Sequence, residues 1–176
     1  LLQDRLGEER VNAMLAELLD RFKFKSQPYA SSTDLVDGFK ALARDEAEAR
    51  LVEDLLENIT LYDFTASDAT VEELENGQFE TTFTVTATKL YADGEGEETE
   101  ADFENSVDIG AFTKRPGYEV LEPADVISFR LEPLVSGEQV VTVTTDEKPA
   151  FVGVDPYSKF IDRQGDDNIT AVEEAD

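Results

Sequence analysis

The spacing of the apolar residues changes once along this chain, near Asn58, and this change constrains the fold more than any single motif. Before it, apolar residues recur at the spacing of one helical face. They are Val11, Met14, Leu15, Leu18, Leu19 and Phe22. After it, apolar and polar residues alternate, as in half-buried strands. We therefore predict an α+β chain in which a short helical segment, residues 1–57, precedes a sheet.

Three helices are predicted in the helical segment. One covers residues 8–22, a shorter one is capped by Ser32 or Thr33, and a third begins near Asp45. Three helices of this size build only a small core. We expect them to have lost packing partners or to lean on the sheet that follows.

The strands are predicted from alternation and from the Gly, Pro and Asn turns between them. The clearest run is 79–91, in which Phe79, Phe83, Val85 and Ala87 share one face and Thr82, Thr84, Thr86 and Thr88 share the other. Further runs lie at 59–62, 70–74, 99–112, around Ile127, Phe129 and Leu131, and from Gln139 onward. About seven short strands joined in this way favour an immunoglobulin-like sandwich, with a small barrel as the alternative. We assign residues 58–170 to this sandwich and 171–176 to an acidic tail.

The charge of the chain limits its partners. The sequence has 41 acidic and 15 basic residues, and its formal net charge is −26. Such a chain repels phosphate backbones and anionic lipid surfaces, so we expect neither nucleic-acid binding nor direct membrane contact. We expect the acidic run from Asp93 to Glu104 to be a solvated surface. The other interpretation is that it recruits a basic partner or a divalent cation.

The chain contains no histidine and no cysteine. Imidazole bases, thiolate nucleophiles and zinc sites built from the usual ligands are therefore excluded within these 176 residues. No catalytic or cofactor-binding residue can be assigned. Asp162, Asp166 and Asp167 could gather around calcium, but turn formation and an ion pair with Arg163 or Lys159 explain them better.

The end of the chain carries a long motif. From Asp146 to Asn168 it reads D-E-K-P-A-F-V-G-V-D-P-Y-S-K-F-I-D-R-Q-G-D-D-N. This stretch, with E-N-I-T-L-Y-D at 57–63 and L-Y-A-D-G at 90–94, resembles bacterial membrane proteins in which an ABC-type permease is fused to an aminopeptidase-N-like zinc metallopeptidase, a gluzincin. The matching motif residues are Asp146, Lys148, Pro149, Asp155, Pro156, Asp162, Arg163 and Asn168.

The resemblance implies a role for each part of the chain. Residues 1–57 would be the last helices of the peptidase region, and the sandwich would support a catalytic domain that lies upstream in the same polypeptide. The parent protein would release N-terminal residues from peptides. Its zinc would be held outside this chain. Because the chain begins Leu-Leu-Gln, we expect it to be a fragment or a processed product. It would be a soluble segment of an inner-membrane protein. The resemblance does not indicate on which side of the membrane this segment lies.

A second hypothesis belongs to a different class of function. The chain would be a free-standing acidic immunoglobulin-like module that binds a protein through an edge strand or through the threonine face of the strand at 79–91. That face could also simply be exposed to solvent, because threonine is common in strands.

Overall fold

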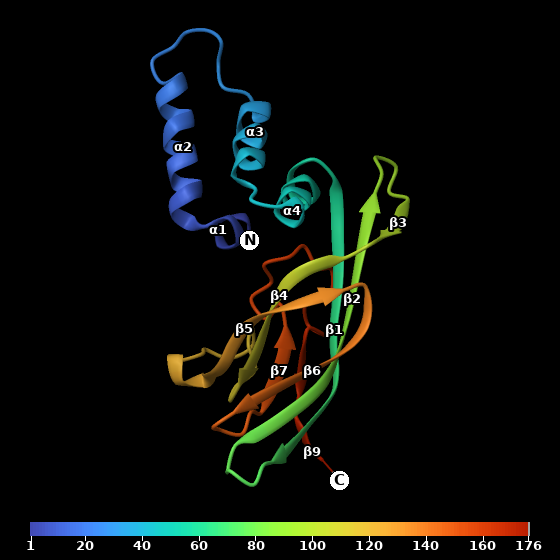
Figure 1. Ribbon diagram of the computed structural model, residues 1–176. Coiled ribbons are helices and arrows are strands. Elements are labelled where there is room, and N and C mark those ends of the chain that lie inside the picture. The colour runs from blue at the N-terminus through green and yellow to red at the C-terminus, as the bar shows by residue number, and fades with distance from the viewer. Residues whose placement is uncertain (176) are drawn as a thin grey trace. The chain divides into compact units, whose positions relative to one another are not determined.

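The computed structural model describes residues 1–175, and the chain divides into two compact units, Leu1–Thr60 and Leu61–Asp176. The first is helical and the second is a β-sandwich, so the α+β architecture predicted from the sequence is confirmed (Figure 1). The boundary lies within a few residues of the change in apolar spacing near Asn58.

The helical unit contains four helices, α1 (Leu2–Leu6), α2 (Glu8–Phe22), α3 (Ser32–Leu42) and α4 (Glu46–Leu56). The predicted helix at 8–22 is α2. The cap of α3 is Ser31, one residue before the predicted Ser32 or Thr33, because Ser31 and Asp34 form a reciprocal capping box. The helix predicted to begin near Asp45 is α4; Asp45 caps it and accepts a hydrogen bond from the Glu48 amide at 2.9 Å.

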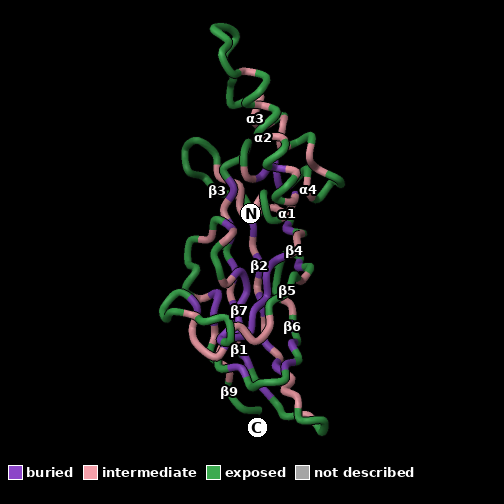
Figure 2. Tube along the Cα trace, turned by 90° about the vertical axis from the view of Figure 1, so that its left-hand side faces the viewer, coloured by how far each residue is buried: buried purple, intermediate pink, exposed green. Residues whose placement is uncertain are grey.

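The core of the helical unit is small. Leu6, Val11 and Val52 form its buried centre, and four partly buried side chains pack around them: Leu2, Leu15, Phe39 and Leu42. No residue of α3 is buried. In Figure 2 both α2 and α3 are drawn almost entirely as exposed or intermediate. Most of the apolar face predicted for α2 is thus not fully covered by the other helices of this unit.

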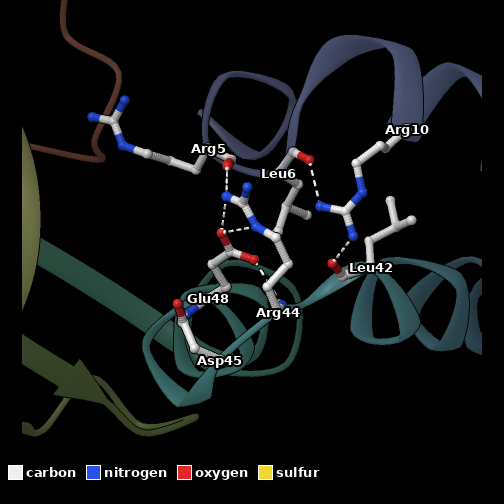
Figure 3. A network of polar contacts seen from close by, with 7 residues as sticks. All are labelled: Arg5, Leu6, Arg10, Leu42, Arg44, Asp45 and Glu48. Atoms are coloured by element: carbon white, nitrogen blue, oxygen red, sulfur yellow. Dashed lines mark hydrogen bonds and ion pairs between the residues drawn. The ribbon is translucent and has the colours of Figure 1, made fainter.

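Two arginines hold the ends of these helices together (Figure 3). Arg10 donates to the carbonyl oxygens of Leu6 at 2.9 Å and Leu42 at 2.5 Å. Arg44 donates through its Nε to Glu48 at 2.8 Å and through a terminal nitrogen to the Arg5 carbonyl at 3.1 Å. These bonds use carbonyl groups that helix ends leave without an intrahelical partner.

The sandwich has two sheets. The first contains β1 (Ile59–Glu73), β2 (Phe79–Ala92), β3 (Glu98–Ala101), β6 (Gly137–Thr145) and β9 (Glu173–Glu174), in the order β3-β2-β1-β9 with β6 also paired to β2. The second contains β4 (Glu104–Phe112), β5 (Val126–Val135), β7 (Phe151–Val154) and β8 (Ile169–Ala171), in the order β5-β4-β7-β8. Two separate sheets favour the predicted sandwich over the barrel.

Two predicted strand boundaries were wrong. Residues 59–62 and 70–74 belong to one long strand, β1, in which Asp68 takes a left-handed φ of 53° and shifts the alternation by one residue. Conversely, the run 99–112 is two strands, because the chain passes from one sheet to the other at Asp102 and Phe103. The Phe103 amide donates to the Ser136 hydroxyl at 2.7 Å, which fixes this crossing.

The interior of the sandwich is aromatic at one end. Tyr62, Phe64, Phe103 and Phe160 pack with ring centroids between 4.9 and 6.1 Å apart, mostly edge to face. Most of the remaining core is aliphatic and comes from alternate positions of β2, β4, β6 and β7, including Val85, Val107, Ile109, Val143 and Val152. Phe83 of β2 and Phe112 of β4 are buried as well. In the run 79–91, the face that carries Phe83, Val85 and Ala87 is thus the one that points into the core.

The apolar face of β5 is not part of the core. Phe129, Leu131 and Val135 are 40%, 50% and 50% exposed, whereas Leu134 on the opposite face is buried. Arg130 shares the face of Leu134 and donates to the Thr142 carbonyl of β6 at 3.0 Å. Phe129 and Leu131 lie opposite Gly110 and Asp108 of β4, so the register of β5 against β4 places these apolar side chains on the outer side.

The predicted acidic tail is partly strand. Ala171 ends β8, and Glu173 and Glu174 of β9 pair in parallel with Thr70 and Val71 of β1. The Ala175 amide continues this pairing by donating to the Val71 carbonyl at 3.1 Å.

Candidate docking face of the sandwich

The terminal motif folds into a tight turn around Asp155. This residue has a φ of 42° and is buried, and its two carboxylate oxygens accept the amides of Lys159 at 3.0 Å and Phe160 at 2.9 Å. Burial raises the pKa of the Asp155 carboxyl to about 6, and the nearby carboxylates of Asp108 and Asp162 act in the same direction. The turn at Asp155-Pro156 is thus organised by its own aspartate.

This turn sends its side chains to opposite sides of the second sheet. Phe160 points inward to the aromatic cluster. Tyr157 and Lys159 lie on the outer face, where the Tyr157 ring is 5.2 Å from that of Phe129 and Lys159 pairs with Asp108 at 2.9 Å. Lys159 also lies over the Phe129 ring, with its Nζ 5.8 Å from the ring centroid. The motif therefore contributes both to the core and to an outer surface.

The residues after the turn cover the edge of β1. The Tyr62 amide donates to the Ile161 carbonyl at 2.9 Å, the Phe64 amide to the Asp162 carboxylate at 3.0 Å, and the Ala66 amide to the Asp167 carbonyl at 2.9 Å. Asp162 also accepts the Gln164 amide at 2.9 Å. A side chain and two carbonyls thus take the amides that this strand edge would otherwise leave exposed.

The remaining motif residues are structural. Asp146 accepts from Gln78 at 2.8 Å, Pro149 is buried, Lys148 pairs with Glu174, and Arg163 pairs with Glu98. Asn168 is buried, and its carbonyl accepts the Val154 amide at 2.9 Å. A Cβ on Gly153 would come within 2.7 Å of that carbonyl oxygen, so only glycine allows the strand to lie this close.

The three calcium candidates do not form a metal site. Asp162 is engaged as described, the Asp166 carbonyl accepts from Arg115 at 2.7 Å, and burial raises the pKa of Asp167. Across residues 1–175 there is no group of three or more His, Cys, Asp or Glu side chains that could hold a metal ion.

The surface that sequence reasoning missed is a continuous apolar row on the outer side of β5. Its members alternate along the strand up to the irregularity before Ser128: Phe129, Leu131, Pro133 and Val135. We call them the β5 row. Tyr157, 48% exposed, extends the row across the face, and Phe112 beneath it is buried with its ring over Gly110. The alternation of β5 was visible in the sequence, but the side it would face was not.

Asp108, opposite Leu131 on β4, pairs with Lys159, and Arg130 pairs with Glu132 at 2.8 Å. Glu104, opposite Val135 at the end of the β5 row, is exposed and forms no ion pair among the described residues. Covering the middle of the row would therefore remove no unpaired charge from water, whereas covering its end would bury the Glu104 carboxylate. The second unit as a whole is strongly acidic, with 28 acidic and seven basic residues.

The threonine face predicted as an alternative docking surface lies on the outer side of β2. Thr82, Thr84, Thr86 and Thr88 are half-buried there. They face β6, where Thr82 and Thr142 hydroxyls lie 3.4 Å apart and Val140, opposite Thr84, is 71% exposed. This face offers a single exposed aliphatic side chain, in contrast to the β5 row.

Comparison of the chain with protein-family models, with curated proteins and with solved structures finds no match. In the part of the chain that the structure describes, no helix combines the length and the apolar character needed to cross a bilayer.

Proposed function

We propose that this chain is a non-catalytic region whose sandwich packs, through the β5 row and Tyr157, against a catalytic domain carried outside it. The observation that carries the proposal is the exposure of Phe129, Leu131 and Val135 on one face of a strand whose opposite face is held to β6. Exposed apolar patches of this kind mark interaction surfaces in folded domains.

The energetics of the face favour docking. Removing apolar surface from water contributes about 25 cal/mol per Å². Aromatic anchors such as Phe129 and Tyr157 commonly supply most of the binding energy of an interface. Because Asp108 is already buried and paired with Lys159, covering the row removes little further water from that carboxylate.

The net charge of the chain argues that the partner is a different protein domain and not a second copy of this chain. A second copy would bring another net charge of −26 against the first, and the two would repel. The resemblance of the terminal motif supplies the identity that we propose. The partner would be a zinc aminopeptidase-like domain upstream in the same polypeptide, itself joined to a membrane permease. That domain would hold the zinc.

The test uses the sequence encoded upstream in the same reading frame, produced as a separate protein and titrated with this chain by calorimetry. Leu131→Lys should weaken the complex by about thirtyfold or more, because it places a charge in the centre of the buried face. Val140→Lys is the matched control, since it adds the same charge at an exposed position of the other sheet. Equal affinity for the two variants, or no complex with the unmodified chain, would refute the proposal.

Catalysis is tested separately. This chain alone, supplied with zinc and aminoacyl-nitroanilides, should give no turnover above that of buffer. Measurable turnover would contradict the non-catalytic role. If the reading frame begins at Leu1 and the β5 row binds an unrelated protein instead, the chain is the free-standing interaction module.

A further inference from the structure

A groove runs between α2 and α3 in the helical unit, and it is lined by residues of these two helices alone. Its volume is about 580 Å³. Met14 and Leu18 of α2 and Ala41 and Leu42 of α3 give it an apolar lining. The helices are in close contact at its base, since a Cβ on Gly38 would lie 2.6 Å from the Met14 sulfur. The space is therefore a groove on the surface of a helix pair.

The dimensions suit a third helix. The α3 helix has 11 residues and is about 16 Å long, which corresponds to three turns of a helix laid beside it. Ala13 and Ala41 on the two walls are small and exposed, so a helix could approach closely. A helix bound in such a groove presents apolar anchors at i, i+3 or i+4, and i+7.

The apolar side of α2 lacks cover in this unit. Val11 is its one buried residue, Met14 and Leu18 are half-buried, and Leu19 is 70% exposed. Amphipathic helices derive most of their stability from covering such a face. An occupant would therefore stabilise the helix pair as well as bind to it.

The charges around the groove define the chemistry of the occupant. The two arginines that line the groove already have partners within the helical unit. Arg10 donates to the Leu6 and Leu42 carbonyls (Figure 3), and Arg21 pairs with Asp34 at 3.5 Å. Within residues 1–175, Glu17 and Asp37 at the rim form no ion pair, and Lys40, which lies near Asp37, pairs with Glu57. The rim thus presents unpaired negative charge beside an apolar floor.

We propose that the groove between α2 and α3 binds an amphipathic α-helix that carries Lys or Arg beside its apolar stripe. The apolar stripe fills the groove over Met14 and Leu18, and the basic residues pair with Glu17 and Asp37. This site is independent of the β5 row and does not rest on the function proposed for the sandwich. A second copy of this acidic chain does not meet the charge requirement.

The test compares two fluorescent 18-residue peptides with the same leucine and alanine stripe, one flanked by lysines and the other by glutamates. Anisotropy is measured with the full chain. The lysine peptide should bind about tenfold or more tightly than the glutamate peptide, and added salt should reduce the difference. Circular dichroism should show that the bound lysine peptide is helical.

Charge reversal separates the groove from the general acidity of the chain. Glu17→Lys combined with Asp37→Lys should remove or invert the preference for the lysine peptide. Glu72→Lys combined with Glu73→Lys makes the same change in net charge on β1 of the sandwich and should leave the preference intact. An equal loss in both double variants would show non-specific attraction and would overturn the proposal.

A second test fills the groove with a larger side chain and measures peptide binding again. Ala41→Phe, at an exposed helical position, should weaken binding of the lysine peptide by about tenfold or more while the helical signal of the chain is retained. Unchanged binding in this variant would overturn the proposal. So would a concentration-dependent dimer of the unmodified chain that Ala41→Phe abolishes, because the occupant would then be a second copy.

Discussion

The helical unit and the sandwich both expose apolar side chains, but for opposite reasons. Among the described residues, four buried apolar side chains belong to the first unit and twenty to the second. The sandwich has a complete core, so the β5 row is apolar surface that its stability does not require. The helices have too little core, so their exposed apolar face needs cover. We therefore interpret the exposed apolar side chains as the proposed docking surface in the sandwich and as an incomplete core in the helical unit.

The largest effect is expected from the aromatic cluster of the sandwich. Phe160→Ala should lower its free energy of unfolding by about 3–5 kcal/mol, because it removes a ring that contacts Tyr62, Phe64 and Phe103. Urea unfolding followed by tyrosine fluorescence measures this loss. Ile161→Ala, at a neighbouring residue that is 53% exposed, is the control and should change little.

In the helical unit the corresponding change should act locally. Leu6→Ala removes a fully buried side chain from a core of three residues, at a cost of about 2–5 kcal/mol. The helical circular dichroism signal should melt earlier, while the transition of the sandwich stays where it was. A single cooperative transition that shifts as a whole would contradict the division into two units.

Protonation of Asp155 should stabilise the sandwich. Its pKa in the folded state, about 6, lies above the ordinary value of 3.8, so its contribution to stability is complete below pH 3.8 and is lost as the pH rises through 6. Asp155→Asn cannot titrate and should lack this component. The free energy of unfolding at pH 7 and pH 5 is compared in both proteins. The same pH response in both proteins would contradict the raised pKa of Asp155.

The smallest effect is expected at the start of α3. Ser31→Ala removes the side chain that accepts the Asp34 amide and should cost about 1 kcal/mol of helix stability. Ser32→Ala, one residue later, leaves the capping box intact and should cost less. Thermal melting of the helical signal distinguishes the two variants, and equal losses would place the cap elsewhere.

The sequence predicted those elements whose pattern is local. The apolar stripe of α2 and the alternation of β2 are complete in themselves, and both elements formed as predicted. The long β1 was not predicted, because the small and polar residues around Asp68 resemble a loop and the left-handed backbone there depends on its neighbours. Alternation also showed which residues of β5 share a face, but not which face would be covered. That depends on the register of β5 against β4, in which Leu131 lies opposite Asp108.

The candidate surfaces were predictable only in part. The pair Asp155-Pro156 is typical of a turn, and the structure has one there, with the residues after it covering the edge of β1. That Tyr157 would extend the β5 row depends on the pairing of β4 with β5 and β7, which no local pattern encodes. The groove between α2 and α3 depends likewise on contact at Gly38 and Met14.

The most direct test of this account asks whether the β5 row lies outside the core of the sandwich. Phe129→Thr and Leu131→Thr are combined, since threonine keeps a high strand propensity. Native-state hydrogen exchange then measures the opening free energy at the amides of β4. The account predicts a change within about 1 kcal/mol. A loss of about 3–5 kcal/mol, comparable to that expected for Phe160→Ala, would show that the row is part of the core and would contradict its role as a docking face.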